Sequence, residues 1–159
     1  MPPTALELEP SSTSRATSGY DEWMSVTPDS PASDYARLSP FDLTIYNELD
    51  RLTALKPNWD GEGANRVKPE IIEAARELIS ALPRSIKAKV KVPAVVPMRK
   101  GNLQFEWHDG PKTLELEIET PGTIHYLKWH SEAGIEEEEV RLIADTETVT
   151  GLIEWFVEG

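Results

Sequence analysis

A strict alternation of apolar and polar residues runs through residues 103–130 and is interrupted by two turn signals. Apolar residues occupy positions 103, 105 and 107, then 114, 116 and 118, with polar or charged residues between them. The turns are marked by residues 109–112 (Asp-Gly-Pro-Lys) and by Pro121-Gly122, where Gly122 can take the positive φ of a type II turn. Because successive side chains of a strand point to opposite faces, this pattern predicts an antiparallel β-meander with one buried face.

The register of this meander follows from keeping the apolar side chains on one face. Between residues 103 and 118 we expect the pairs Trp107–Leu114, Phe105–Leu116, Leu103–Ile118, Glu106–Glu115 and Gln104–Glu117. Across the second turn we expect the pairs Leu114–Trp129, Leu116–Leu127 and Glu115–Lys128. The face turned away from the core then carries seven polar or aromatic residues: Glu106, His108, Glu115, Glu117, Glu119, Tyr126 and Lys128.

Three amphipathic helices are predicted around the meander. Ser39 is placed to cap the first helix, with Pro40 at its first position and Asp42 as the acid of a capping box. Its apolar stripe ends before Pro57. The second helix starts at Pro69 and stops at Pro83, and the third spans about residues 146–157.

Two further strands are suggested on either side of the meander. Residues 92–96 could form a further extended strand, which Pro93 and Pro97 would confine to a sheet edge. Val140 and Leu142 hint at another strand. The fold class predicted is α+β, with two N-terminal helices and a C-terminal helix packed on one face of a three- to five-stranded, mainly antiparallel sheet.

The chain is expected to divide into a tail and one domain. Residues 1–38 are rich in Ser, Thr and Pro and have no lasting periodicity, which is typical of a disordered segment, whereas residues 39–159 form the α+β domain. Tyr20, Trp23, Met24 and Tyr35 are unusual residues for such a tail. They either dock loosely on the domain or form a short motif that becomes ordered on a partner.

The composition indicates the cellular location of the protein and the charge of its partner. The chain contains no cysteine, has no apolar run of roughly 18–20 residues and lacks a basic, apolar leader, so we expect a cytoplasmic protein without a membrane segment. The net charge is −12, and residues 102–159 hold fourteen acidic and three basic side chains. Such a surface disfavours nucleic acid. The local exception is a basic cluster: Arg84, Lys87, Lys89, Lys91, Arg99 and Lys100.

The most distinctive string is the loop of residues 58–64, Asn58-Trp59-Asp60-Gly61-Glu62-Gly63-Ala64. Its glycines allow a tight path, Trp59 can anchor it in the core, and Asp60 can accept hydrogen bonds from turn amides. A rigid connection between helices is the simplest interpretation, and a loop that contacts a ligand is the alternative. Calcium needs six to eight oxygen ligands, which the string does not supply. We therefore predict no metal here.

Residues 45–130 resemble a group of small, uncharacterised bacterial and phage proteins. The resemblance is carried by NWDGEGA, the proline-initiated helix that follows it, and the strands LQFEWH, LELEI and IHYLK. Proteins of this group share an NWDG-x-GA loop and a closing β-meander. Their position near mobile elements and toxin–antitoxin-like gene pairs implies a regulatory binding role. The resemblance implies no reaction, ligand or site residue.

The outward glutamates have three interpretations. They form a solvated face that discourages sheet-to-sheet association, a docking surface for a basic protein, or a metal or catalytic site built from Glu106, Glu115 and His108. The residues 136–139, four consecutive glutamates, are either a solvated loop or strand edge or an extension of this surface. Three histidines that alternate between faces, without cysteine, do not predict a zinc site.

The function predicted is that of a non-enzymatic, acidic protein-interaction module of the antitoxin, inhibitor or anti-defence type. Its partner would be a basic protein, its contact residues Glu106, Glu115, Glu117, Glu119 and Tyr126, and it would need no cofactor. No nucleophile elbow, P-loop or dinucleotide fingerprint is present. The alternative is a small-molecule or metal-dependent enzyme that uses the loop of Asn58, Trp59, Asp60, Gly61 and Glu62. A weaker possibility is a nucleic-acid contact through the stretch from Arg84 to Lys100.

Overall fold

The computed structural model describes residues 38–142 and 145–158. The predicted tail, apart from Leu38, lies outside these residues, as do the aromatic side chains at positions 20, 23 and 35. Within the described part of the chain, no helix is long and apolar enough to cross a membrane.

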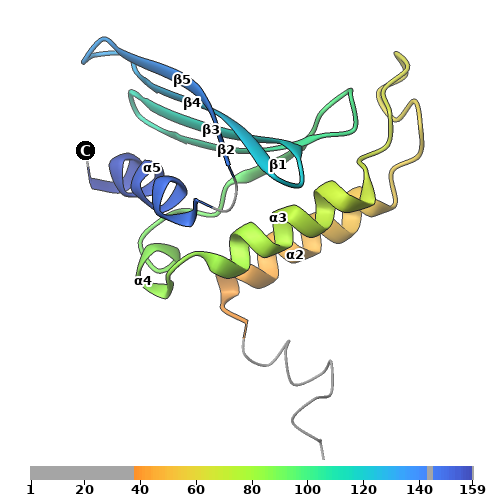
Figure 1. Ribbon diagram of the computed structural model, residues 1–159, viewed down its shortest axis with the longest axis horizontal. Coiled ribbons are helices and arrows are strands. Elements are labelled where there is room, and N and C mark those ends of the chain that lie inside the picture. The colour runs from red at the N-terminus through yellow and green to blue at the C-terminus, as the bar shows by residue number, and fades with distance from the viewer. Residues whose placement is uncertain (1–37, 143–144, 159) are drawn as a thin grey trace, which may run out of the picture. The chain divides into compact units, whose positions relative to one another are not determined.

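Five antiparallel strands form a single sheet in the order in which they follow one another along the chain (Figure 1). The strands are β1 (Ala94–Pro97), β2 (Leu103–Asp109), β3 (Lys112–Thr120), β4 (Thr123–His130) and β5 (Ile135–Leu142). The predicted α+β class and antiparallel meander are confirmed. The short strand β1, with Pro97 at its end, is an edge strand as predicted, and the glutamate run lies in β5 at the opposite edge.

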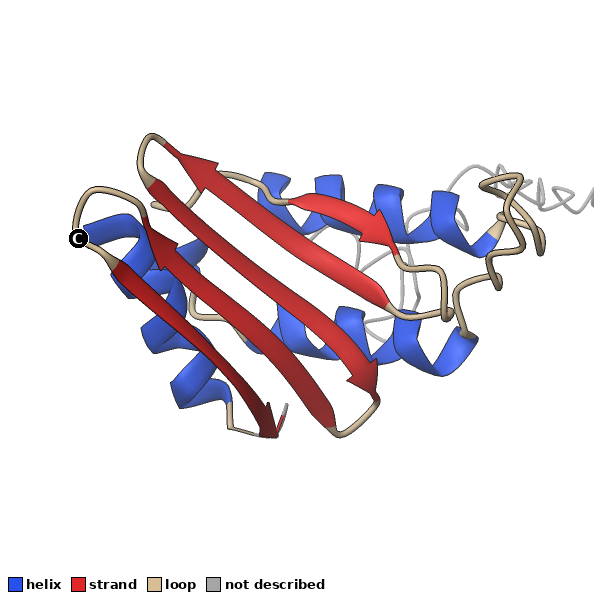
Figure 2. Ribbon diagram, turned by 90° about the horizontal axis from the view of Figure 1, so that it is seen from above, coloured by secondary structure: helices blue, strands red, loops and turns tan. Residues whose placement is uncertain are grey.

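Four helices accompany the sheet in the described residues, and Figure 2 shows them behind one of its faces. They are α2 (Pro40–Thr53), α3 (Pro69–Ala81), α4 (Arg84–Lys87) and α5 (Thr146–Glu158). The single turn α4 was not predicted, because four residues are too few to show a helical period. On the opposite face of the sheet, none of the described residues forms a helix.

The start of α2 is fixed by the predicted capping box. Asp42 donates its backbone N–H to the Ser39 hydroxyl oxygen at 3.2 Å, and the Asp42 carboxylate accepts from the Ser39 backbone N–H at 3.1 Å. Two backbone donors that lack helical partners are thereby satisfied. Pro40 adds a preset φ at the first helical position.

One hydrophobic core lies between the helices and the covered face, here called the inner face. It contains Ile45 and Leu49 from α2, Ile72 and Ile79 from α3, and Ile153 from α5, all at most 2% exposed. The inner face contributes a continuous apolar layer: Leu103, Phe105, Trp107, Leu114, Leu116, Ile118, Ile124 and Tyr126. This layer fixes which side chains of the sheet remain on the open face.

The β2–β3 register is the one predicted, with Trp107 opposite Leu114 and Glu106 opposite Glu115. The predicted β3–β4 register is wrong by one residue. Pairing from the two-residue turn starts with Thr120 opposite Thr123, but an irregularity at Glu119 then brings Ile118 opposite Ile124. One extra residue in a strand reverses the face of every later side chain in the partner. Gly122 also keeps a negative φ, so the predicted type II turn is absent.

Candidate functional site

The open face of the sheet, here called the outer face, is the surface on which sequence reasoning placed the contact residues. Figure 2 shows it in front of the helices. The register assigns to it five glutamates, two histidines, and no lysine or arginine from the described strands. Its residues on β2 to β5 are Gln104, Glu106, His108, Thr113, Glu115, Glu117, His125, Leu127, Trp129, Glu136, Glu138 and Val140. Glu119 is exposed at the end of the face, where the pairing slips.

The shifted register corrects two of the residues predicted for this face. Tyr126 lies opposite Leu116 on the inner face and is only 2% exposed, so the prediction that its side chain is available on the open surface is wrong. Lys128 lies opposite Leu114 rather than Glu115, also on the inner side. The outer face therefore loses the one cation that was expected to offset Glu115.

The shift has the opposite effect on two apolar residues that were predicted to be buried. Trp129 is opposite Thr113 and 44% exposed, and Leu127 is opposite Glu115 and half-buried. Val140 on β5 is 54% exposed. Sequence reasoning missed Trp129 and Leu127 because both alternating sets of residues in β4 contain apolar side chains. Either set could form the buried face until the irregularity at Glu119 is known.

Amide side chains donate hydrogen bonds to the central carboxylates of this face. Gln104 donates through Nε2 to Glu106 Oε1 at 2.9 Å and to Glu115 Oε2 at 3.1 Å. Asn102, itself buried, donates through Nδ2 to Glu117 Oε1 at 3.0 Å. Like charges directly opposite one another destabilise a sheet. Here a shared amide, rather than a neighbouring lysine, makes the Glu106–Glu115 pair tolerable.

The two histidines of the outer face are each paired with a glutamate. His125 Nε2 lies 2.7 Å from Glu138 Oε1, and His108 Nε2 lies 3.6 Å from Glu106 Oε2. The other ring nitrogen of His108 lies 3.1 Å from the Thr113 hydroxyl. A catalytic or metal site at Glu106, Glu115 and His108 was one of the alternatives. Among the described residues, no group of three or more acidic or histidine side chains is arranged to hold a metal ion.

A shallow depression of about 250 Å³ lies in the centre of the outer face. Four glutamates line it: Glu115 and Glu117 from β3, and Glu136 and Glu138 from β5. The rest of its lining consists of Gln104, His125, Tyr126 and Leu127. The depression thus joins carboxylates that are separated by about twenty residues in sequence. It can receive a cationic side chain, because four glutamates line it and no lysine or arginine of the described strands does.

The glutamate run is divided between the two faces of β5. Glu136 and Glu138 extend the outer face, whereas Glu137 and Glu139 lie on the inner side with Tyr126. The Tyr126 hydroxyl donates to Glu137 Oε1 at 2.5 Å and to Glu139 Oε2 at 3.2 Å. The run is therefore both a strand edge and an extension of the acidic surface, as its alternation requires.

The loop of residues 58–64 is held by its own polar groups. The Asp60 carboxylate accepts hydrogen bonds from the backbone N–H groups of Glu62 at 2.8 Å and Ala64 at 3.0 Å, as predicted for a turn aspartate. These bonds, together with the charge of Arg99, hold the pKa of the Asp60 carboxyl below its usual value. Asn58 takes a φ of 65° and accepts from Gly63 N–H at 2.6 Å.

Side chains from outside the loop complete this network. Arg99 pairs with Asp60 Oδ2 at 3.1 Å and with Glu62 Oε2 at 3.2 Å, so both loop carboxylates have a cation. Trp59 is half-buried and lies outside the core cluster. Its indole N–H donates to Asn65 O at 2.9 Å, so it fastens the loop by a hydrogen bond rather than by core packing. No residue of this loop lines the depression in the outer face.

Comparison of the chain with known protein families, with curated proteins and with solved structures finds no match. The resemblance carried by the NWDGEGA loop stays a prediction.

Proposed function

We propose that this protein is a non-enzymatic interaction module, of the antitoxin, inhibitor or anti-defence type, that docks a basic protein through its outer face. The observation that carries the proposal is that, in the described part of the chain, one face of the sheet is free of helices and its strands present five glutamates without a lysine or arginine. A field of one sign speeds association with a partner of opposite charge and suppresses association with acidic proteins and nucleic acids.

The exposed apolar side chains can add hydrophobic binding energy to the electrostatic attraction of the glutamates. Trp129 and Val140 are 44% and 54% exposed, and Leu127 lies at the central depression. Aromatic anchors surrounded by polar groups are the usual source of binding energy at protein interfaces. We infer that Trp129 packs against an apolar part of the partner while the glutamates meet its lysine or arginine side chains.

The amide bonds on the face favour this role further. Gln104 and Asn102 fix three carboxylates in the free protein. Groups that are already ordered lose less conformational entropy on binding. A purely solvated acidic face has no need of such positioning, because free carboxylates are hydrated equally well in many rotamers.

The proposal is tested by reversing charge at the depression and, as a matched control, elsewhere. One triple variant carries Glu115→Lys, Glu117→Lys and Glu138→Lys. The control carries Glu70→Lys, Glu77→Lys and Glu154→Lys at exposed helical positions, so the net charge changes equally. Circular dichroism verifies that both retain the fold. Capture from a lysate of the source organism identifies the partner, and calorimetry with the purified partner measures its affinity.

We expect the outer-face variant to lose the partner and the control to keep it. Affinity for the unchanged protein should also fall as the salt concentration rises from 0.1 to 0.5 M, because exposed charges are screened. Trp129→Ala should weaken binding without changing this salt dependence. Undiminished affinity in both the outer-face variant and high salt would contradict the proposal.

A further inference from the structure

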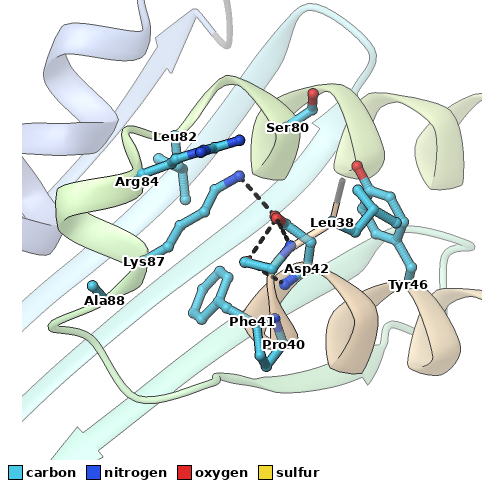
Figure 3. Close-up of a pocket in the computed structure, with 11 residues that line it drawn as sticks. Leu38, Pro40, Phe41, Asp42, Tyr46, Ser80, Leu82, Arg84, Lys87 and Ala88 are labelled. Carbon is cyan, nitrogen blue, oxygen red and sulfur yellow. Dashed lines mark hydrogen bonds and ion pairs between the residues drawn. The ribbon is translucent and has the colours of Figure 1, made fainter. Parts of the chain in front are cut away.

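A pocket lies in the helical layer, where the start of α2 meets the end of α3 and the short helix α4 (Figure 3). Its volume is about 630 Å³, which falls in the range of roughly 300–1,000 Å³ typical of small-molecule sites. None of its lining residues belongs to the outer face. The pocket is therefore separate from the proposed docking surface, and an inference about it does not rest on that proposal.

A buried ion pair forms part of the pocket wall. Lys87 Nζ donates to Asp42 Oδ1 at 2.7 Å, and both side chains are more than nine-tenths buried. The second oxygen of Asp42 accepts from the Ser39 backbone and hydroxyl groups. Among the described residues, Asp42 is the one hydrogen-bond acceptor for Lys87. An ammonium group has three N–H donors, so Lys87 can bond a further acceptor in the pocket.

Arg84 adds a second cation beside Lys87. Both residues line the pocket, and Figure 3 shows their side chains running in the same direction. No carboxylate of the described residues pairs with Arg84, so the pocket holds two cations and one carboxylate. A bound anion would balance this charge, and the planar guanidinium of arginine suits a carboxylate in particular.

The remainder of the lining is mainly apolar and already in place. Phe41 and Leu82 are part of the hydrophobic core, and Tyr46 packs against it. Tyr46 is held from behind by Arg76, whose guanidinium lies 5.2 Å from the ring centroid and whose carbonyl accepts from the tyrosine hydroxyl at 3.4 Å. A ligand would therefore meet a preformed apolar wall, and its organic part should be hydrophobic.

We propose that this pocket binds a small organic carboxylate with an apolar body. The carboxylate lies between Arg84 and Lys87, and the body packs against Phe41 and Leu82. A single negative charge fits better than several, because the protein as a whole carries a net charge of −12 and repels polyanions.

The test uses the full-length, isotope-labelled chain and three probes followed by amide chemical shifts. The probes are 4-phenylbutyrate, its uncharged amide 4-phenylbutyramide, and inorganic phosphate. We expect saturable shifts for 4-phenylbutyrate at the amides of residues 38–46 and 80–88. The amide should bind at least about tenfold more weakly, because it lacks the charge-assisted hydrogen bonds. Phosphate should bind more weakly still, because it lacks the apolar body.

Two variants distinguish binding in the pocket from nonspecific attraction of the anion to exposed cations. Lys87 is not substituted in this binding test, because its loss leaves a buried carboxylate unpaired and would affect the fold as well as binding. Arg84→Gln changes an exposed side chain and should weaken 4-phenylbutyrate binding by about tenfold or more. Arg66→Gln, at an exposed arginine without an ion pair in the described residues, should leave binding unchanged. The proposal is overturned if 4-phenylbutyrate does not bind, if Arg84→Gln binds it equally well, or if either other probe matches it.

Discussion

The Tyr126 hydroxyl donates a 2.5 Å hydrogen bond to Glu137 Oε1, across the pair of strands β4 and β5. The tyrosine ring is 2% exposed, whereas the glutamate side chain is about half exposed. The bond thus ties the acidic edge strand to the hydrophobic core. It is also the largest cause of the lowered pKa of the Glu137 carboxyl, with Lys128 adding to it and burial opposing it.

Tyr126→Phe should therefore destabilise the fold by about 1–3 kcal/mol near neutral pH, because a hydrogen bond to a charged acceptor is lost while the ring is kept. The loss should depend on pH. A carboxyl whose folded pKa is depressed stabilises the fold above its unfolded value of about 4.5, and this stabilisation disappears as pH falls through the folded value. Urea unfolding of both proteins at pH 7 and pH 3 measures the difference.

At pH 3 the free energies of unfolding of Tyr126→Phe and the unchanged protein should be closer than at pH 7. A difference that stays constant between these pH values would show that the ionised Glu137 does not contribute. Thr113→Val serves as a control, since Thr113 lies on the neighbouring strand and contacts neither Tyr126 nor Glu137 through a hydrogen bond.

Much of the fold was predictable from residues that act locally. Ser39 and Asp42 set the start of α2 through contacts three residues apart, and alternation of apolar residues set the faces of β2 and β3. The face of β4 was not predictable. It depends on the irregularity at Glu119, a position whose side chain gives no sign that the backbone pairing will slip there.

The candidate sites were likewise predictable where local residues determine them, and not where the packing of distant segments does. The glutamates of β2 and β3 were placed correctly because alternation alone positions them. The amide bridge from Gln104, which makes their opposition tolerable, requires the pairing register as well as side-chain rotamers. The pair formed by Asp42 and Lys87 joins residues 45 positions apart, so it depends on how α4 packs beside α2. No periodicity in the sequence carries that information.

Lys112→Met should destabilise the protein by about 2–3 kcal/mol, because it removes charged hydrogen bonds to buried carbonyls. The Lys112 ammonium is buried and donates to the backbone carbonyls of Trp155 at 3.1 Å and Phe156 at 3.2 Å, near the C-terminal end of α5. A cation there satisfies carbonyls that lack helical partners and complements the helix dipole. Chemical denaturation measures the loss of stability.

The matched control is Lys128→Met, whose ammonium also lies over the Trp155 ring, at 4.8 Å from its centroid, but bonds neither of these carbonyls. Its replacement should lower the free energy of unfolding by less than about 1 kcal/mol. Equal effects of the two substitutions would mean that the bonds to the end of α5 contribute little.

Gly101→Ala should destabilise the protein by about 2–3 kcal/mol, because a side chain is placed on a backbone conformation that favours glycine. Gly101 has a φ of +86°, and an added Cβ would lie 2.8 Å from the backbone oxygen of Arg66. The substitution therefore combines an unfavourable backbone conformation with a clash that no side-chain rotation relieves. Gly122→Ala, where φ is not in this range and no atom lies within 4 Å, should change the midpoint of thermal unfolding little. Similar shifts for both variants would contradict this explanation.

Lys87→Met should be the most damaging of the substitutions, at about 3–5 kcal/mol, because it leaves the carboxylate of Asp42 buried without its cation.

Burial alone raises the pKa of Asp42 and is the largest single influence on it. The hydrogen bonds from Lys87 and Ser39 and the charge of Lys87 together outweigh burial, so the pKa lies below its ordinary value of 3.8. In the unchanged protein this carboxylate thus stabilises the fold above pH 3.8, and that stabilisation is lost as the pH falls through the lower, folded value. In Lys87→Met the pKa of Asp42 should rise, because burial is then opposed only by Ser39, and acid should partly restore stability relative to the unchanged protein. Lys89→Met removes an exposed lysine whose ammonium lies 3.5 Å from Glu158, and should lower the free energy of unfolding by less than about 1 kcal/mol at every pH. Urea unfolding of the three proteins between pH 3 and pH 7 distinguishes these outcomes, and a Lys87→Met deficit that grows on acidification would refute the assignment.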